Sequence, residues 1–415
     1  MSTEACFHRD TCRLCGGRDL ALVLKLQPTP PANAFVPADQ LDKPQAVFPL
    51  DIFFCRSCAH VQLLDVVDPR VLFENYVYVS GTSPSFVAHF ERYANDMIQR
   101  LGLKAGDLVV DIGSNDGTLL RFFQRAGMMV LGVDPAKQIA ADATRAGIPT
   151  LAEFFTPELG ERIRKEHGPA ALITANNVFA HADRLDRITD AVEHLLKPDG
   201  AFVFEVSYLV DVYRHTLFDT MYHEHVAYHS VKPLIPFFRA RRMELTEALR
   251  VPTHGGSLRG IARPAGNGFK AGDSVRAAIK EEEELGLDRE ETLRQFGQKI
   301  DQLKTELVTL LKRLKAEGKT IAGFGAPAKA TTLMYHFGLG RDVVDFIVDD
   351  SPLKQGLFTP GLHVPVLPPS ALAEKKPDYL VLLAWNFAQP IMKNNQAFKD
   401  AGGHFIVPVP TVEVY

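Results

Sequence analysis

The sequence lacks the features typical of membrane proteins and nucleic-acid-binding proteins. Its 415 residues carry 46 Lys and Arg against 50 Asp and Glu, a formal net charge of -4, so no basic excess favours a polyanionic partner. No apolar run approaches the roughly 20 residues that span a bilayer. The first residues, MSTEACFHRDTCRL, contain no apolar core of a signal peptide. We therefore expect a cytoplasmic protein with no nucleic-acid or membrane partner, and we expect a monomer.

Cysteine is scarce as well, but four of the five cysteines form two C-x-x-C pairs, Cys12 with Cys15 and Cys55 with Cys58. A reducing compartment disfavours disulfides, and two such pairs supply the four thiolates of a tetrahedral Zn(II) site. Protein ligands would fill all four positions, so we expect a structural ion. The alternatives are two unrelated buried pairs, or a redox C-x-x-C, which normally opens a helix beside a βαβ unit.

The length of the chain predicts two or three domains. A Pro-rich start is followed by apolar runs that alternate with helical patterns, and this alternation is typical of parallel sheets with crossover helices. A second alternating unit follows a charged helical segment near the middle of the chain. We expect a zinc-binding domain over residues 1–75, a central α/β domain over 76–245, and a connecting hairpin, helices and a second α/β domain over 246–415.

The turn DIGSNDG, residues 111–117, ends an apolar strand and opens a helix. Its pattern differs from the dinucleotide fingerprint G-x-G-x-x-G, and an acid in the turn would repel a phosphate. A ligand with an amino group and a positive centre, S-adenosylmethionine (SAM), fits better than NAD(P). A turn that serves only packing is the other alternative. The predicted cofactor-binding residues are Tyr76, Ser80, Gly113, Asn115, Asp116, Gly117, Asp134, Phe155, Asn177 and His181.

The stretch FDTMYHEHVAYHS, residues 218–230, contains three histidines, two tyrosines and two acids. Histidine has a reference pKa near 6.5 and can act as a neutral base near pH 7. If the stretch is extended, His223 and His225 face the same way; if it is helical, Tyr222 and His225 share a face. A second metal site and a polar loop without chemistry are the alternatives.

The C-terminal unit opens with GFGAPAKATTLM, residues 323–334, in which glycines follow a strand and a lysine sits in the first turns of a helix. Helix N-terminal amides and a lysine suit a diphosphate. The single tryptophan follows another strand, where its ring could stack on a base or a sugar. A fold used only for packing is the alternative. The predicted substrate-binding residues are Tyr222, His254, Gly325, Lys329, Trp385 and Asn386.

A set of motifs in one order resembles a known family over nearly the whole chain. The motifs are CRLC, CRSC, NYVYVSGTS, DIGSNDGTLL, ANNVFAH, FDTMYHEH, HGGSLR, GFGAPAKATTLM and LLAWNFA. They resemble the three-domain C-methyltransferases that act on nucleotide-linked deoxy-keto-sugars. The resemblance implies a zinc-binding domain, a central class-I SAM methyltransferase Rossmann-like domain and a C-terminal Rossmann-like α/β domain.

The resemblance also implies an activity and its catalytic residues. The family methylates C-3 of a dTDP-4-keto-6-deoxy sugar in deoxysugar biosynthesis, and its pattern Tyr-x-Glu-His matches only Tyr222, Glu224 and His225. His225 is then the base, with Tyr222 as its partner and Glu224 as an orienting or sugar-binding group, while His223 and His229 are bystanders. An O- or N-methyltransferase for another acceptor, and a non-catalytic nucleotide-sugar or SAM-binding scaffold, are the alternative functions.

Overall fold

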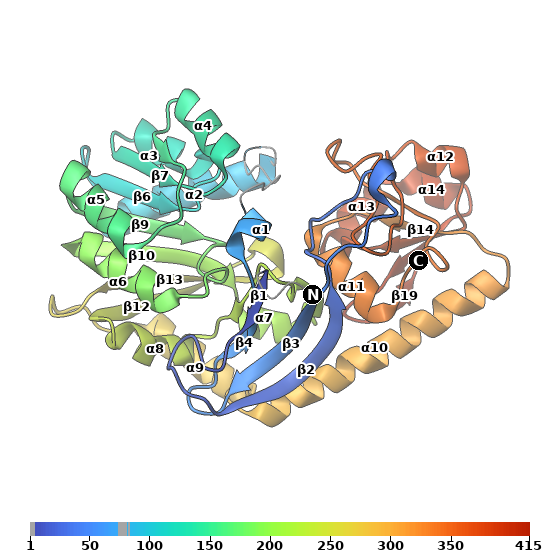
Figure 1. The fold of residues 1–415 in the computed structure, drawn as a ribbon, viewed down its shortest axis with the longest axis horizontal. Coiled ribbons are helices and arrows are strands. Elements are labelled where there is room, and N and C mark those ends of the chain that lie inside the picture. Colours follow the sequence, from blue (N-terminus) through green and yellow to red (C-terminus); the bar gives the residue numbers. More distant parts are fainter. Residues whose placement is uncertain (1–4, 74–80, 82–83) are drawn as a thin grey trace.

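The computed structural model describes residues 5–73, 81 and 84–415. Figure 1 shows a central α/β lobe in cyan and green and a C-terminal α/β lobe in orange and red. The blue N-terminal strands and the long helix α10 (Glu290–Ala316) run between the two lobes. Across these described ranges, none of the helices combines the length and the apolar character that a membrane span needs.

The N-terminal domain is built on a four-stranded sheet with the order β11-β4-β3-β2. Strand β3 alternates buried and half-buried residues over most of its length, as a sheet with one covered face requires. Its edge strand β11 comes from residues far along the chain and begins two positions after His225. The elements are β1 (Cys6–His8), β2 (Leu20–Thr29), η1 (Ala38–Gln40), β3 (Phe48–Cys55), β4 (Val61–Leu63), β5 (Asp65–Val67), α1 (Pro69–Phe73) and β11 (Ala227–Tyr228).

The central domain is a seven-stranded sheet with the order β12-β13-β10-β9-β6-β7-β8. Strand β13 runs antiparallel to both of its neighbours, β12 and β10. Its strands are β6 (Leu108–Ile112), β7 (Met129–Val133), β8 (Thr150–Leu151), β9 (Ala170–Asn176), β10 (Leu196–Ser207), β12 (Met243–Val251) and β13 (Ser257–Pro264). Its helices are α2 (Pro84–Leu101), α3 (Thr118–Arg125), α4 (Lys137–Arg145), α5 (Pro157–His167), α6 (Leu185–Leu195), α7 (Leu209–Arg214), η3 (Phe218–Thr220), α8 (Val231–Arg239) and η4 (Thr253–Gly255).

The strand order reverses between β6 and β9, and sheets of this kind bind their ligands outside the carboxyl ends of the strands at such a reversal. The central sheet also continues further along the chain than the boundary expected at residue 245. Strands β12 and β13 complete it, so the structural unit runs to Pro264. The hairpin that was expected to connect two domains is therefore an edge of the central sheet.

The C-terminal domain follows α9 (Asp273–Glu284) and α10, whose buried residues recur every three or four positions and pack along β2. Its sheet has the order β16-β15-β14-β17-β18-β19, and its order reverses between β14 and β17. The elements are β14 (Ile321–Phe324), α11 (Ala328–Phe337), β15 (Phe346–Val348), β16 (Val366–Leu367), α12 (Ala371–Lys375), β17 (Tyr379–Leu382), η5 (Trp385–Phe387), α13 (Ala388–Asn394), α14 (Gln396–Asp400), β18 (His404–Val407) and β19 (Glu413–Val414).

Candidate active site and metal centre

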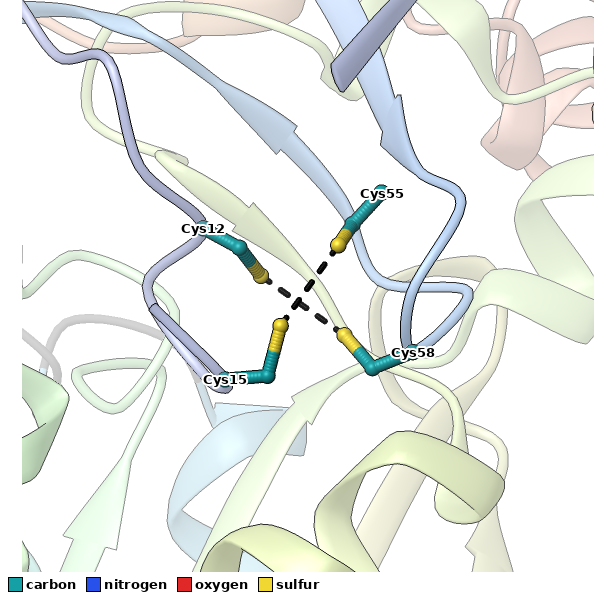
Figure 2. A group of neighbouring side chains, drawn as sticks. All are labelled: Cys12, Cys15, Cys55 and Cys58. Carbon is teal, nitrogen blue, oxygen red and sulfur yellow. Dashed lines mark hydrogen bonds between the residues drawn. The ribbon is translucent and has the colours of Figure 1, made fainter. Parts of the chain in front are cut away.

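The four cysteines of the two C-x-x-C pairs meet in one cluster, with their sulfur atoms all within 4.8 Å of one another. Figure 2 shows the four side chains pointing at a common centre, with Cys12 opposite Cys58 and Cys15 opposite Cys55. Each of these two opposed pairs has a sulfur–sulfur distance of 3.6 Å. A tight backbone turn in each C-x-x-C segment brings its two cysteines to one side of the centre, Cys12 with Cys15 and Cys55 with Cys58.

This cluster fits the ion that the donor set suggests. Zn–S bonds of about 2.3 Å in a tetrahedron would place the sulfur atoms about 3.8 Å apart, close to the observed 3.6 Å. The Gly17 amide also points at Cys15 Sγ from 3.4 Å, a contact that stabilises a thiolate. The four cysteines thus form a closed site for a structural Zn(II), as predicted, with no ligand position left for substrate.

The zinc-binding domain also holds two loops of the central domain in place. Arg13, buried beside Cys12, places its Nε 3.3 Å from the carboxylate of Asp183, two residues after His181. The carbonyl of Val226, next to His225, accepts the amide of a β4 residue at 3.0 Å. The metal-binding domain is therefore connected directly to the segments that bear His181, a predicted cofactor-binding residue, and His225, the predicted base.

The glycine-rich turn lies at the carboxyl end of β6, where the strand order of the central sheet reverses. Gly113 and Gly117 both have left-handed backbones, with φ of +69° and +74°. A Cβ at Gly113 would meet Val178 Cγ2 at 2.3 Å, and a Cβ at Gly117 would meet Ile148 at 2.8 Å. Glycine is therefore required at both positions by conformation and by space.

The two acids of the predicted cofactor site lie in and beside this turn. Asp134 is buried at the end of β7, and its oxygens accept the amides of Asn115 (2.8 Å) and Ala136 (2.9 Å). Burial raises the pKa of Asp134, while these amides lower it. Asp116 accepts hydrogen bonds from Thr118 at the start of α3 and from the amide of Gly81 at 3.1 Å. Each carboxylate retains lone pairs with which to accept from a ligand.

The other predicted cofactor residues fall into two groups. Phe155 is buried next to α5, and Asn177, with a left-handed φ of +55°, donates its amide to Glu205 O at 2.8 Å at the end of β10. Both flank the carboxyl edge of the sheet. Tyr76 and Ser80 lie outside the described residues.

His225 is held in a turn that brings it against Tyr222. The His225 amide donates to the Tyr222 carbonyl at 2.8 Å, and the two ring centroids lie 4.3 Å apart. The stretch is therefore neither extended nor helical here: η3 is followed by a turn and then by β11. The turn nevertheless brings Tyr222 and His225, three positions apart, together as the helical alternative predicted.

The tautomer of His225 follows from its hydrogen bond. Nδ1 lies 2.7 Å from the carbonyl of Thr220, which can only accept, so Nδ1 carries the proton and Nε2 is the basic nitrogen of the neutral ring. His181 stacks on His225 with centroids 5.0 Å apart. Burial, and then the neighbouring His225, lower the pKa of His181 well below its ordinary value. His181 therefore presents a neutral ring to His225 near pH 7.

The remaining histidines of the stretch lie in the protein interior. His223 Nε2 lies 3.2 Å from the carbonyls of Phe48 and Pro49, and His229 stacks on Phe179 at 5.5 Å. Burial lowers the pKa of each to about 4. Among the described residues these histidines join no cluster of metal-ligating side chains, since the cysteine set is the one such group found there.

Glu224 is buried and faces the N-terminal domain. Its Oε1 accepts a hydrogen bond from Asn33 Nδ2 at 2.9 Å. The contact holds the carboxylate of Glu224, the residue before His225. Its partner Asn33 lies 191 positions away in the sequence. The sequence contains no local signal for this pairing.

Two predicted substrate residues of the C-terminal domain meet a central-domain acid. Trp385 Nε1 donates to Asp219 Oδ2 at 2.6 Å, and Lys329 Nζ lies 3.4 Å from the same oxygen and 4.0 Å from the centroid of the Trp385 ring. Burial raises the pKa of Asp219 and lowers that of Lys329, and their attraction opposes both shifts. The lysine therefore has a counter-ion within the chain.

The other predicted substrate residues lie near the reversal point of the C-terminal sheet or in η4. Gly325, at the end of β14, has φ of +83°, and a Cβ there would meet that of Ala384 at 2.7 Å. Asn386 lies in η5, after β17, with its Oδ1 buried. His254 belongs to η4, and its side chain lies outside the description.

Sequence reasoning missed a buried polar cluster at the carboxyl end of β10. Glu205 accepts from Arg259 Nε at 2.8 Å and lies 3.1 Å from His89 Nε2. Burial alone would raise the pKa of Glu205, but His89 and Arg259 hold it below its ordinary value. The motif HGGSLR contained a hint, because Arg259 pairs with Glu205 across adjacent strands. Nothing local indicates the role of His89 in α2.

Comparisons with known proteins cover the whole of this architecture. Three family models match, described as "Putative zinc binding domain" over residues 12–73, "Methyltransferase domain" over 86–246 and "C-methyltransferase C-terminal domain" over 252–410. The C-methyltransferase NovU of Streptomyces niveus is 37% identical over 405 residues, which span 98% of this chain and 96% of NovU.

Solved structures resemble part of the chain more distantly. Magnesium protoporphyrin IX methyltransferase from Synechocystis PCC 6803 with bound SAH is 13% identical, with a TM-score of 0.35, over 43% of this chain and 83% of its own. The 1,6-didemethyltoxoflavin-N1-methyltransferase of Burkholderia thailandensis is 20% identical, with a TM-score of 0.32, over 43% of this chain and 79% of its own.

Proposed function

Because the chain belongs to the family of SAM-dependent C-methyltransferases, we propose that it methylates C-3 of a nucleotide-linked 4-keto-6-deoxy sugar, with dTDP as the expected nucleotide. The observation that carries this proposal is the arrangement of His225. Its Nδ1 is committed to a carbonyl, its Nε2 is basic, and Tyr222 lies against its ring. Carbon methylation needs such a base, because C-3 becomes a nucleophile only after it loses a proton.

His225 removes the α-proton in the proposed reaction. The proton at C-3 passes to Nε2, and the electron pair of the C–H bond moves into an enolate whose charge rests on the C-4 oxygen. Tyr222 donates a hydrogen bond to that oxygen, and Glu224, held by Asn33, orients the sugar. Bound SAM supplies an electrophilic methyl group. The enolate carbon forms the new C–C bond, and the thioether of S-adenosylhomocysteine (SAH) leaves.

The cofactor in this proposal occupies the crevice at the ends of β6 and β7. Gly113, Asn115 and Gly117 line the turn, and Asp134 accepts from the two ribose hydroxyls. The residues that complete the proposed cofactor site are Tyr76, Ser80, Asp116, Phe155, Asn177 and His181. The left-handed turn and the reversal of strand order at this place support the assignment.

The nucleotide half of the substrate is proposed to lie at the reversal point of the C-terminal sheet. Gly325 packs its backbone against Ala384 in the turn after β14, and Trp385 and Asn386 follow the neighbouring strand. Lys329 stands in the first turn of α11 and is a candidate for the diphosphate, in addition to its contact with Asp219. His254 is proposed to reach the sugar. The substrate would then bridge the two lobes that the stretch 218–225 connects.

Hydrogen–deuterium exchange tests the carbanion mechanism directly. With SAH in place of SAM, the enzyme in D₂O should exchange the C-3 proton of a matching keto-sugar, and with SAM it should give a product heavier by one CH₂ unit. His225→Asn should lower both rates by about 10²–10⁴-fold, with SAH affinity unchanged. His215→Asn, a half-exposed surface position, is the control. Full turnover in His225→Asn without any exchange would rule the mechanism out and favour an O- or N-nucleophile.

A further inference from the structure

The base-bearing stretch is attached to the C-terminal domain by an ion pair whose acid is fully buried. Asp219, in η3, is 0% exposed and lies six positions before His225. Its Oδ2 accepts from Trp385 Nε1 at 2.6 Å and lies 3.4 Å from Lys329 Nζ, whose side chain is 12% exposed. The ammonium also sits over the Trp385 ring, at 4.0 Å from its centroid. Carboxylate, ammonium and indole therefore form one closed group across two domains.

Helix α11, which carries Lys329, makes a second contact with the stretch at Met221, two residues after Asp219. Thr332 Oγ1, one turn along α11 from Lys329, donates to the Met221 carbonyl at 2.9 Å. The ring of Phe218 also stacks on that of Phe337 at the end of α11, with centroids 5.2 Å apart. The C-terminal domain thus holds the stretch on both sides of Thr220.

Thr220 is the residue that orients the proposed base. Its carbonyl accepts from His225 Nδ1 at 2.7 Å and thereby determines which nitrogen carries the proton. Asp219 and Met221, the two neighbours of Thr220, are the residues that α11 and Trp385 hold. The position of this carbonyl therefore depends on contacts made by the other domain.

We propose that Lys329, Trp385 and Thr332 are positioning residues for the reaction, acting through Asp219 and the Thr220 carbonyl to hold His225 with Nε2 as the basic nitrogen. The proposal rests on the proposed function, because it takes His225 to be the base. It gives Lys329 and Trp385 a role that needs no contact with the nucleotide. The C-terminal domain then orients the base as well as offering a nucleotide crevice.

The physical reason is the cost of a buried unpaired charge. Without the ammonium, the carboxylate of Asp219 would be a buried charge with no cation beside it. The segment would then move toward water, or the carboxylate would take up a proton. Either change displaces the Thr220 carbonyl. A shift of about 1 Å in a catalytic group costs on the order of a hundred-fold in rate.

The experiment compares Lys329→Met, Trp385→Phe and Thr332→Val in the full-length protein, with ¹⁵N-labelled histidine and steady-state kinetics. The two ring-nitrogen shifts of His225, assigned by their loss in His225→Asn, report the tautomer without any turnover. We expect all three variants to shift the His225 signals toward a mixture of tautomers and to lower kcat by about ten- to a hundred-fold. In Thr332→Val, KM for the nucleotide-sugar and SAH affinity should stay within about two-fold of the parent values.

Lys354→Met is the matched control. Lys354 is another largely buried lysine of the same domain, but its Nζ donates to the Ala326 carbonyl at 2.8 Å and does not touch the stretch 218–225. Its variant should leave the His225 signals unchanged. Thr332→Val preserves the shape of the side chain, so it tests the idea even if the loss of the lysine charge prevents folding.

Unchanged His225 signals in Thr332→Val and Trp385→Phe would overturn the proposal. A rise in KM and in the dissociation constant of a nucleoside diphosphate in Lys329→Met, with kcat intact, would assign the lysine to the diphosphate instead. Failure of the proposed function looks different: His225→Asn would keep its turnover, while the tautomer signals would still respond to the three variants.

Discussion

His225 takes its orientation from neighbours that differ in how far they lie along the chain. Tyr222 and Thr220 are three and five positions away, and both reach it through one turn. His181 stacks on it from the loop after β9, and Glu224 beside it is held by Asn33 of the N-terminal domain. Local spacing thus pairs Tyr222 with His225, while the ring stacked on His225 and the partner of Glu224 come from distant segments.

Asp111, a buried residue at the end of β6, should make the stability of the protein depend on pH. Burial raises its pKa from 3.8 to about 7, and the hydroxyl of Thr174, 2.6 Å away, opposes the rise. The folded protein then binds a proton that the unfolded chain has released, so its stability falls as the pH rises between these two values. The stability of the parent relative to Asp111→Asn should decline through this window and level off above it.

Urea unfolding at a series of pH values measures this difference. Thr174→Val, which removes the opposing hydrogen bond, should extend the window to higher pH. A stability difference between parent and Asp111→Asn that does not vary from pH 4 to pH 7 would contradict the raised pKa.

The glycine-rich turn and α3 show how a helix depends on the residue that precedes it. Gly117 precedes the helix in a left-handed conformation and packs against Ile148, from the segment between α4 and β8. Gly147, the neighbour of Ile148, has a similar φ of +89° but nothing within 4 Å of the place where a Cβ would stand. Substitution of the two glycines therefore distinguishes the effect of backbone strain, common to both, from the effect of steric contact, present only at Gly117.

Gly117→Ala and Gly147→Ala form a matched pair of variants. Both should lose about 1–2 kcal/mol of unfolding free energy from the left-handed backbone. Gly117→Ala should lose about 1–3 kcal/mol more through overpacking against Ile148. Calorimetry with SAH should show weaker binding only in Gly117→Ala. Equal stabilities and equal affinities in the two variants would show that the contact with Ile148 has no role.

The whole molecule is organised around a stretch that belongs to all three domains. Its η3 packs on α11 of the C-terminal domain, its turn carries the candidate base of the central domain, and its β11 is a strand of the N-terminal sheet. The zinc-binding domain adds Arg13, which reaches Asp183 beside the His181 loop. We therefore expect removal of the metal to affect the candidate active site through the fold, because the four cysteines leave no ligand position for substrate.

Metal analysis of the purified protein should find about one Zn(II) per chain. Chelation, or Cys55→Ser, should lower Tm by on the order of 10 °C and reduce methyl transfer. Cys6→Ser, at a cysteine outside the cluster, is the control and should retain metal and Tm. An unchanged Tm in metal-free protein with full activity would contradict a structural role for this site.

Local patterns in the sequence were sufficient for the parts of the molecule that depend on near neighbours. The two C-x-x-C pairs indicated the metal ligands, which the structure brings together, and the glycine turn after an apolar strand predicted the place of the cofactor. The choice of Tyr222 and His225 came from the resemblance to the family pattern Tyr-x-Glu-His and stays a prediction. These signals are readable because turns, strand ends and metal pairs are specified by residues a few positions apart.

Long-range pairing needed the folded chain. Asp219 with Lys329 and Trp385, Glu224 with Asn33, and Glu205 with His89 join residues more than a hundred positions apart, and no local pattern distinguishes such a buried acid from an exposed one. The sequence thus specifies which side chains have the required chemistry. The tertiary structure decides which of them are desolvated together, and desolvation sets their charge, tautomer and orientation.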